Sequence, residues 1–436
     1  MVWNLRILTR RDVEMSGQDR LVLARLLTLL SGQVLGTFLS ASLSVLIARL
    51  TGPATKGTLA ILFATTDLLA VGFVFGVPQS AAYFVRRDPA SAPIVLKYSG
   101  RFSMLCLLLS TVTLLIGKWF FAEEVFGTVG IGYAMLAAMA MVVVLNTVTT
   151  IQGQLLIAIG ATRAYALATN VGIAINGVVA ILLLAQDVRP ILAVVAGQIV
   201  GSIASATLMN ASFRRDIGSL AASSSPALSL SQATFARYGL HAHLGTIGGL
   251  LFKRLDLFIV NTLIGPAAVG VYSVGLTLRD LLMTVARTLS SVVGAEMTDP
   301  ANRVSGYARS ALRRGMGIAA AVAVIAIVMS WIVFPWLIPF FFGNQFEAAV
   351  RPATITVASL LPLSLSLFVG RAIYAAGNPL LGSIGNITGL LIAPVISIFL
   401  IRRFGVSGAG WAAVINSCLM LWVGFVVLRI AEKRSR

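Results

Sequence analysis

The sequence contains the stretch GPATKGTLAILFATTDLL at residues 52–69, and a related stretch, GPAAVGVYSVGLTLRDLL, lies at residues 265–282. Identical residues in the two stretches are separated by a constant 213 positions, and they include two glycines and an acidic residue within an apolar run. We interpret this as an internal duplication. The seven identical pairs are Gly52 and Gly265, Pro53 and Pro266, Ala54 and Ala267, Gly57 and Gly270, Asp67 and Asp280, Leu68 and Leu281, and Leu69 and Leu282.

The composition around these stretches is that of a membrane protein. Hydrophobic residues make up 58% of the 436 residues and charged residues only 11%, whereas soluble domains are about 25% charged. Apolar runs of roughly 20 residues, long enough to cross a bilayer, recur from Leu27 to Leu428. The first 26 residues are polar and rich in arginine, and the first apolar run is too long for a signal peptide. We therefore expect a cytoplasmic N-terminus and many transmembrane helices.

The fold predicted from these runs is an all-α polytopic membrane protein with about twelve transmembrane helices. Six spans per half is an even number, so the two lobes are expected to be related by a pseudo-two-fold axis along the membrane normal, with a central cavity between them. The predicted segments are a cytoplasmic N-terminal segment (1–26), an N-terminal six-helix lobe (27–213), a cytoplasmic linker (214–236), a C-terminal six-helix lobe (237–430) and a cytoplasmic tail (431–436).

The formal net charge of +18 reflects topology. With the N-terminus in the cytoplasm, most Lys and Arg residues fall on the cytoplasmic side, as the positive-inside rule requires, and no nucleic-acid partner is expected. Cys106 and Cys418 lie in separate apolar runs, and His241 and His243 have no acidic or Cys cluster beside them. No phosphate-binding G-x-x-x-x-G-K-[ST] motif occurs. We predict no catalytic residues, no metal and no cofactor.

Charged residues inside the predicted spans are the candidate site, because an ionised group facing lipid at mid-helix costs at least about 2.5 kcal/mol. In the seventh span, Lys253 and Asp256 share a helix face and can pair, whereas Arg254 is rotated by roughly 100° and is expected to be free. In the eighth span, Asp280 and Arg287 are seven residues apart and nearly eclipsed, which leaves Arg279 as the second unpaired cation.

A free guanidinium in a wet cavity suits phosphate, because its planar fork offers parallel donors. We therefore predict that Arg254 and Arg279, with Lys253 and Arg371, bind a pyrophosphate. The acids Asp67, Asp256 and Asp280 are candidate coupling or cavity residues. The alternative is that all these charges form structural ion pairs between helices. As equivalent positions of the duplication, Asp67 and Asp280 either face each other across the cavity or each make a local contact within its own half.

Three segments carry a family resemblance. Residues 47–87 resemble the first two helices of bacterial polysaccharide transporters, the oligosaccharide flippases of the multidrug/oligosaccharidyl-lipid/polysaccharide superfamily. Residues 253–282 are similar to their seventh and eighth helices, in which an Asp precedes a G-P-x-x-V-G-x-Y turn; Asp256, Gly265, Gly270 and Tyr272 match this pattern. The segment from Phe340 to Asn386, with its A-x-G-N-P turn, resembles the tenth-helix region.

The resemblance implies two six-helix lobes and outward flipping of an undecaprenyl-pyrophosphate-linked oligosaccharide by alternating access, for surface or exopolysaccharide synthesis. It also implies the bacterial cytoplasmic (inner) membrane, with both termini cytoplasmic. The expected partners are the lipid-linked substrate, membrane lipids, and polysaccharide polymerase or export proteins.

Two other functions were weighed. A cation-coupled multidrug or metabolite antiporter of the related multidrug and toxin extrusion branch requires acids deep in the first lobe, where only Asp67 is available. A glycosyl polymerase or ligase requires catalytic groups and a sizeable exoplasmic loop, and the sequence contains no such loop.

Overall fold

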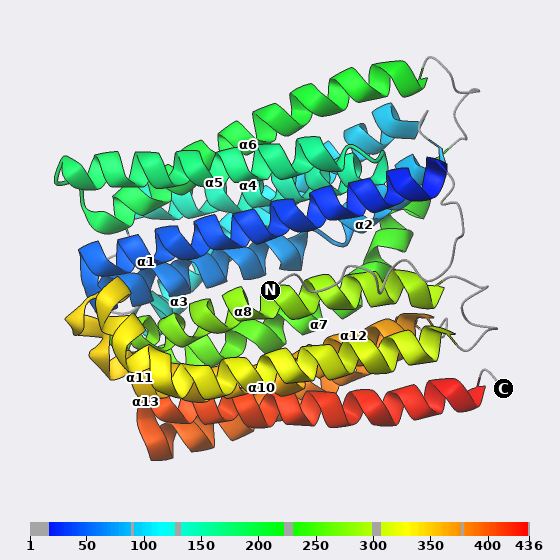
Figure 1. Cartoon of the computed structure of the whole chain (residues 1–436). Helices are drawn as coiled ribbons and strands as arrows, with labels where there is room; N and C mark the ends of the chain where they lie inside the picture. Colours follow the sequence, from blue (N-terminus) through cyan, green and yellow to red (C-terminus); the bar gives the residue numbers. More distant parts are fainter. Residues whose placement is uncertain are drawn as a thin grey trace.

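The protein is a bundle of long, roughly parallel helices in a computed structural model (Figure 1). The structure describes residues 17–88, 91–126, 132–221, 230–298, 307–375 and 379–434, and it contains no strand in these ranges. The helices of the first half are α1 (Gly17–Phe73), α2 (Val77–Arg87), α3 (Ala92–Phe126), α4 (Tyr133–Ala158), α5 (Thr162–Ala185) and α6 (Pro190–Ala221). Those of the second half are α7 (Gln232–Leu263), α8 (Pro266–Thr298), α10 (Tyr307–Phe342), η3 (Asn344–Ala349), α11 (Val350–Ala358), α12 (Leu360–Ala375) and α13 (Pro379–Arg434).

The predicted number of membrane crossings is confirmed within the described residues. Nine helical stretches are long and apolar enough to span a membrane. Two of them are interrupted by a glycine with positive φ, Gly52 in α1 and Gly405 in α13, and each therefore provides two crossing segments. Helix α7 is not among the nine stretches, but its 32 residues are long enough to cross and it runs beside them, so the bundle has twelve segments of crossing length. Accordingly, α1 begins and α13 ends at the same end of the bundle (Figure 1).

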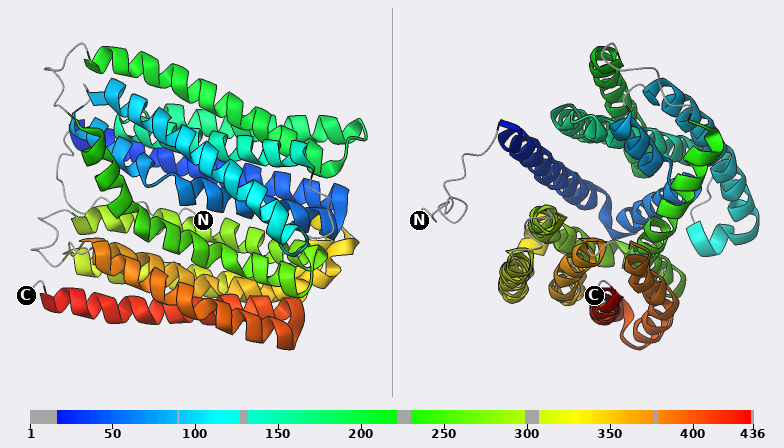
Figure 2. Two further views of the ribbon diagram at one scale, coloured as in Figure 1. Left: turned by 180° about the vertical axis from the view of Figure 1, so that it is seen from behind. Right: turned by 90° about the vertical axis from the view of Figure 1, so that its right-hand side faces the viewer.

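The helices form two groups, one from each half of the sequence, which are visible in the end-on view (Figure 2). Large apolar side chains on their outer faces are exposed, including Trp119, Trp336, Phe340 and Leu391. Such exposure is expected where lipid is the solvent, since burial of apolar surface away from water is then unnecessary. The fold is the predicted all-α, two-lobe membrane architecture.

The connection between the lobes is more helical than the sequence suggests. Helix α6 continues through Arg214 and Arg215 to Ala221, and α7 begins at Gln232, where the Ser231 hydroxyl accepts a hydrogen bond from the Thr234 backbone N–H at 3.2 Å. The predicted linker 214–236 therefore contains the ends of two helices. Residues 222–229 lie outside the described part of the chain.

The duplicated stretches form the same local structure in both halves. Gly52 and Gly265 both have positive φ, 82° and 119°, a conformation that glycine adopts without a steric penalty. The proline that follows each glycine begins the next helical segment, because proline needs no N–H partner in a first helical turn. Each Gly-Pro pair is thus a turn between two crossing segments.

The two Gly-Pro turns also contact each other across the lobes. A Cβ added to Gly57 would lie 2.7 Å from the Gly270 nitrogen and still closer to the Pro266 carbonyl oxygen. A Cβ added to Gly270 would lie 2.7 Å from the Pro53 carbonyl carbon and closer still to its oxygen. These contacts are reciprocal, as a pseudo-two-fold axis requires, and only glycine permits the close approach of α1 and α8.

A second inter-lobe contact forms near the opposite end of the bundle. Phe235, in the first turn of α7, is fully buried in the core of the first lobe. The Ser80 hydroxyl donates to the Phe235 carbonyl oxygen at 2.9 Å, and the Tyr83 and Tyr238 rings stack with centroids 4.3 Å apart. The start of α7 therefore packs on α2 and α3, although the rest of α7 runs beside α8 and α13.

Candidate functional site

Asp67 and Arg254 form an ion pair that joins the two lobes. Arg254 Nη2 on α7 lies 3.0 Å from Asp67 Oδ2 on the second segment of α1. The prediction that Arg254 is free is therefore wrong, because the helical-wheel argument considered only carboxylates on its own helix. The side chains remain 37% and 35% exposed.

A second cluster of charges lies on α7 and α8. The fully buried Tyr272 donates its hydroxyl to Asp256 Oδ2 at 2.5 Å, and the Leu257 N–H donates to Asp256 Oδ1 at 2.8 Å. Asp256 thus has a tyrosine partner on α8, and its predicted pairing with Lys253 of its own helix stays a prediction. The Lys253 side chain lies outside the described residues.

Arg279 belongs to this cluster and is paired, contrary to the prediction. Its Nη2 lies 3.2 Å from Asp280 Oδ1, and its side chain is only 13% exposed. Adjacent residues on a helix point in directions about 100° apart, but the long arginine side chain reaches back to its neighbour. Arg279 therefore has a carboxylate partner and little exposed surface for a ligand.

The predicted pairing of Asp280 with Arg287 is present. Arg287 Nη2 lies 3.7 Å from Asp280 Oδ1, the same oxygen that contacts Arg279, and both side chains are 47% exposed. Asp280 thus makes a local contact within its own half, whereas Asp67 pairs across the lobes, so the two duplicated acids have different roles. Asp280 is thus shared by two guanidinium groups, and the exposed Arg287 is the less closely paired of the two.

Arg371 extends this positive surface along α8. It projects from α12, is exposed, and its Nη2 lies 3.5 Å from the Ser291 hydroxyl. Ser291 is one turn beyond Arg287 on the same helix, and its hydroxyl donates to the Arg287 carbonyl oxygen at 2.9 Å. We call Arg287, Ser291 and Arg371 the α8 basic strip. Arg287 was not among the predicted ligands, although its seven-residue spacing from Asp280 placed it on the correct face.

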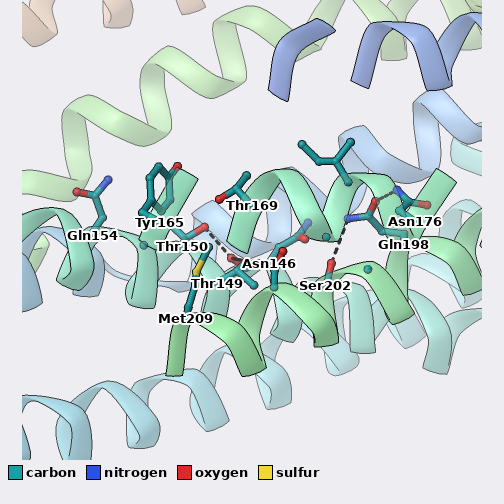
Figure 3. Close-up of a pocket in the computed structure, with 15 residues that line it drawn as sticks. Asn146, Thr149, Thr150, Gln154, Tyr165, Thr169, Asn176, Gln198, Ser202 and Met209 are labelled. Atoms are coloured by element: carbon teal, nitrogen blue, oxygen red, sulfur yellow. Dashed lines mark hydrogen bonds between the residues drawn. The ribbon is translucent and has the colours of Figure 1, made fainter. Parts of the chain in front are cut away.

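A polar cavity of about 250 Å³ lies in the first lobe between α4, α5 and α6 (Figure 3). Sequence reasoning missed it. A signal was present, because each of the three helices carries polar or small residues three or four positions apart on one face. The lining residues are Asn146, Thr149, Thr150, Gly153 and Gln154 of α4, Tyr165, Thr169, Gly172, Ile173 and Asn176 of α5, and Gln198, Gly201, Ser202, Ser205 and Met209 of α6.

Glycines bring α5 and α6 together beside this cavity. A Cβ added to Gly201 would lie 2.8 Å from the Asn176 Cβ, and one added to Gly172 would lie 2.6 Å from the Gly201 carbonyl oxygen. Across the lining, the Asn176 amide N–H donates to Gln198 Oε1 at 2.8 Å, and the Gln198 amide N–H donates to the Ser202 hydroxyl at 3.2 Å. The cavity wall is therefore a connected network of neutral polar groups.

Two lobes of helices that are long and apolar enough to cross a membrane define a multi-pass membrane protein. Residues 22–295 match the family described as polysaccharide biosynthesis protein, and the chain belongs to this family.

Comparison with a curated relative agrees with this assignment. The chain is 18% identical over 180 residues to the probable low-salt glycan biosynthesis flippase Agl15 of Haloferax volcanii. The match covers 41% of this chain and 38% of that protein, so it spans well under half of the relative's length.

Solved structures of multidrug transporters share the fold. An inward-facing multidrug resistance MATE family transporter of the MOP superfamily superposes with a TM-score of 0.67 at 15% identity, covering 92% of this chain and 95% of that one. The eukaryotic MATE transporter AtDTX14 gives 0.65 at 13% identity, with 95% and 99% covered. A MOP superfamily transporter from Pyrococcus furiosus, whose binding pocket is described as having reverse polarity, gives 0.66 at 14% identity, with 95% and 96% covered.

Proposed function

We propose that the protein is a flippase that moves a lipid-linked oligosaccharide, carried on undecaprenyl pyrophosphate, from the cytoplasmic to the outer face of a bacterial inner membrane. Family membership supports a role in polysaccharide biosynthesis. The observation that carries the proposal is the α8 basic strip, in which Arg287 and Arg371 are exposed within membrane-spanning helices. Exposed guanidinium groups are matched to the oxygens of a pyrophosphate.

The ion pairs refine which cations contact the substrate. Arg254 and Arg279 already have carboxylate partners at 3.0 Å and 3.2 Å. Arg287 is less strongly held, at 3.7 Å from a carboxylate that it shares, and Arg371 contacts a hydroxyl. We therefore propose Arg287 and Arg371 as the principal pyrophosphate ligands, with Arg254 released to the substrate only when its pair with Asp67 opens.

Alternating access requires the lobes to separate first at one end and then at the other. The reciprocal Gly-Pro turns provide a close contact at one end, and the contact of α7 with α2 and α3 provides one at the other. The Asp67–Arg254 pair lies between lobes and must stretch or break as they move. We propose that the substrate pyrophosphate replaces Asp67 as the partner of Arg254 during this movement.

Deletion and complementation test the proposal. Cells that lack the protein are expected to accumulate lipid-linked oligosaccharide on the cytoplasmic face and to lose surface polysaccharide. Arg287→Ala and Arg371→Ala are expected to reduce transport roughly ten- to hundredfold, which corresponds to a charged hydrogen bond of about 1.5–3 kcal/mol. Arg403→Ala, which alters an exposed arginine near the Gly405 kink, is the matched control. Normal complementation by both strip variants would exclude them as ligands.

A multidrug antiporter is the second candidate, because the solved structures of that branch share this fold. The charge distribution favours the flippase. Among the residues that line the first-lobe cavity there is no carboxylate, and Asp67 is paired with Arg254. Unchanged polysaccharide together with increased drug sensitivity in the deletion strain would favour the antiporter.

A further inference from the structure

The first-lobe cavity differs chemically from the α8 basic strip. Its lining contains no charged side chain. Four amide side chains, several hydroxyl groups and one phenol supply both donors and acceptors at close range (Figure 3). A cation would find no countercharge in this wall, and an isolated ion away from water is costly. A pyrophosphate would find no cation. The lining therefore suits a neutral polar ligand.

Two groups in the wall indicate what the ligand must offer. Asn176 Oδ1 and the Thr169 hydroxyl oxygen are buried and have no hydrogen-bond partner within the described part of the chain. The Asn176 amide nitrogen is already used in its bond to Gln198, so its oxygen is left without a donor. A buried acceptor without a donor costs about 1–3 kcal/mol. Both oxygens have almost no accessible surface, so a ligand recovers that energy only when its entry turns these side chains toward the cavity.

One part of the wall is aromatic. The Tyr165 ring packs against Gly153 of α4, where an added Cβ would lie 2.7 Å from its Cε2 atom. The absence of a side chain at Gly153 leaves room for the Tyr165 ring beside α4 at the cavity wall. Sugars combine hydroxyl groups around their edge with an apolar C–H face, so an aromatic wall beside a hydroxyl- and amide-rich wall matches both of their surfaces.

We propose that this cavity binds one neutral sugar of the oligosaccharide while the α8 basic strip holds the pyrophosphate. The proposal rests on the flippase function given above and assigns it a second, sugar-recognising site. At about 250 Å³ the cavity is smaller than typical ligand pockets of roughly 300–1,000 Å³. This size suits one sugar ring, so the remaining sugars of the oligosaccharide lie outside the cavity.

Isosteric variants test the site in the full-length protein. Thr169→Val and Asn176→Leu remove the two unpartnered acceptors with little change in volume. Both are expected to reduce oligosaccharide transport at least tenfold, while binding of undecaprenyl pyrophosphate to the purified protein stays at the wild-type level. The matched controls are Thr207→Val and Asn210→Leu on α6, which lie outside the lining and are expected to transport normally.

A labelling experiment on the wild-type protein does not depend on how the variants fold. The source organism's surface polysaccharide is hydrolysed, and each neutral monosaccharide found is made into a diazirine-bearing methyl glycoside. Photolabelling of the purified protein is expected to modify peptides of α4, α5 and α6, and an excess of the unlabelled methyl glycoside is expected to prevent it. Labels confined to other helices would overturn the proposal.

The outcomes separate the two proposals. If deletion leaves polysaccharide and lipid-linked intermediates unchanged, the flippase function fails. If deletion has the expected effect but both cavity variants transport at the wild-type rate, the sugar site fails and the flippase function stands. Equal loss of pyrophosphate binding and transport in the cavity variants would also reject a separate sugar site, because the cavity would then not act independently of the strip.

Discussion

Adding one methyl group to Gly57 or Gly270 is expected to push the two lobes apart at the Gly-Pro turns. In each case the new Cβ would lie 2.7 Å from a backbone atom of the opposite lobe and closer still to a carbonyl oxygen. That separation must increase to at least 3.4 Å for ordinary van der Waals contact. Both partners are backbone atoms, so no side chain can rotate away, and the helices themselves must move.

The magnitude follows from the cost of overpacking, which is about 1–3 kcal/mol in a well-packed interior. The penalty applies to the conformation in which the turns touch and is absent when they are apart. A difference of this size changes the ratio of two conformations by roughly 5- to 150-fold. Gly57→Ala and Gly270→Ala are therefore expected to shift the population toward separation at this end, and to do so by similar amounts because the contacts are reciprocal.

The shift can be measured with spin labels at Leu192 of α6 and Trp336 of α10, which are exposed and belong to different lobes. Cys418 is exposed and is first replaced by serine, whereas Cys106 is buried. Longer inter-label distances are expected in both alanine variants. Gly72→Ala is the control, because a Cβ at Gly72 on the same helix would meet nothing within 4 Å. Wild-type distance distributions in both alanine variants would refute the reasoning.

Four further substitutions test the charged groups. Asp67→Ala and Arg254→Ala are expected to change the free energy of unfolding by less than about 1 kcal/mol, because the pair is partly exposed, yet both should impair transport. Partial rescue of transport by the charge-exchanged double variant would confirm that the two residues act as a pair. Normal transport by both single variants would show that the ion pair has no role in transport. Arg279→Ala is expected to reduce the free energy of unfolding, and so to lower the melting temperature. The loss should be smaller than the roughly 3–5 kcal/mol typical of a fully buried pair, because Asp280 is 47% exposed and retains a second partner. An unchanged melting temperature would count against a structural role. Lys56→Met is expected to raise the melting temperature. The Lys56 side chain is only 6% exposed, and its ammonium contacts the Ser44 hydroxyl and the Phe342 ring but no carboxylate in the described chain, so its charge is buried without a countercharge. A lower melting temperature would show that these two contacts stabilise the protein by more than the burial of the charge costs.

Partners across helices could not be predicted from residue spacing alone. The seven-residue spacing of Asp280 and Arg287 correctly predicted their pairing, because both residues lie on one helix. The same reasoning failed for Arg254, whose carboxylate partner is 187 positions away in the sequence on α1. Nor did spacing predict that Asp256 accepts a hydrogen bond from a tyrosine on α8. Helical periodicity describes the faces of one helix and contains no information about which neighbour meets each face.

The membrane architecture and the duplication follow from the sequence alone. They depend on local features, because the length of each apolar run sets the crossing segments and identical residues at a constant separation reveal the repeat. Only the tertiary structure decided that the turns meet reciprocally, that Arg287 and Arg371 border the same serine, and that polar faces of three helices enclose one cavity. Such arrangements depend on the relative rotation of helices packed in lipid, which is set by small residues at their contacts and is not encoded by any single segment.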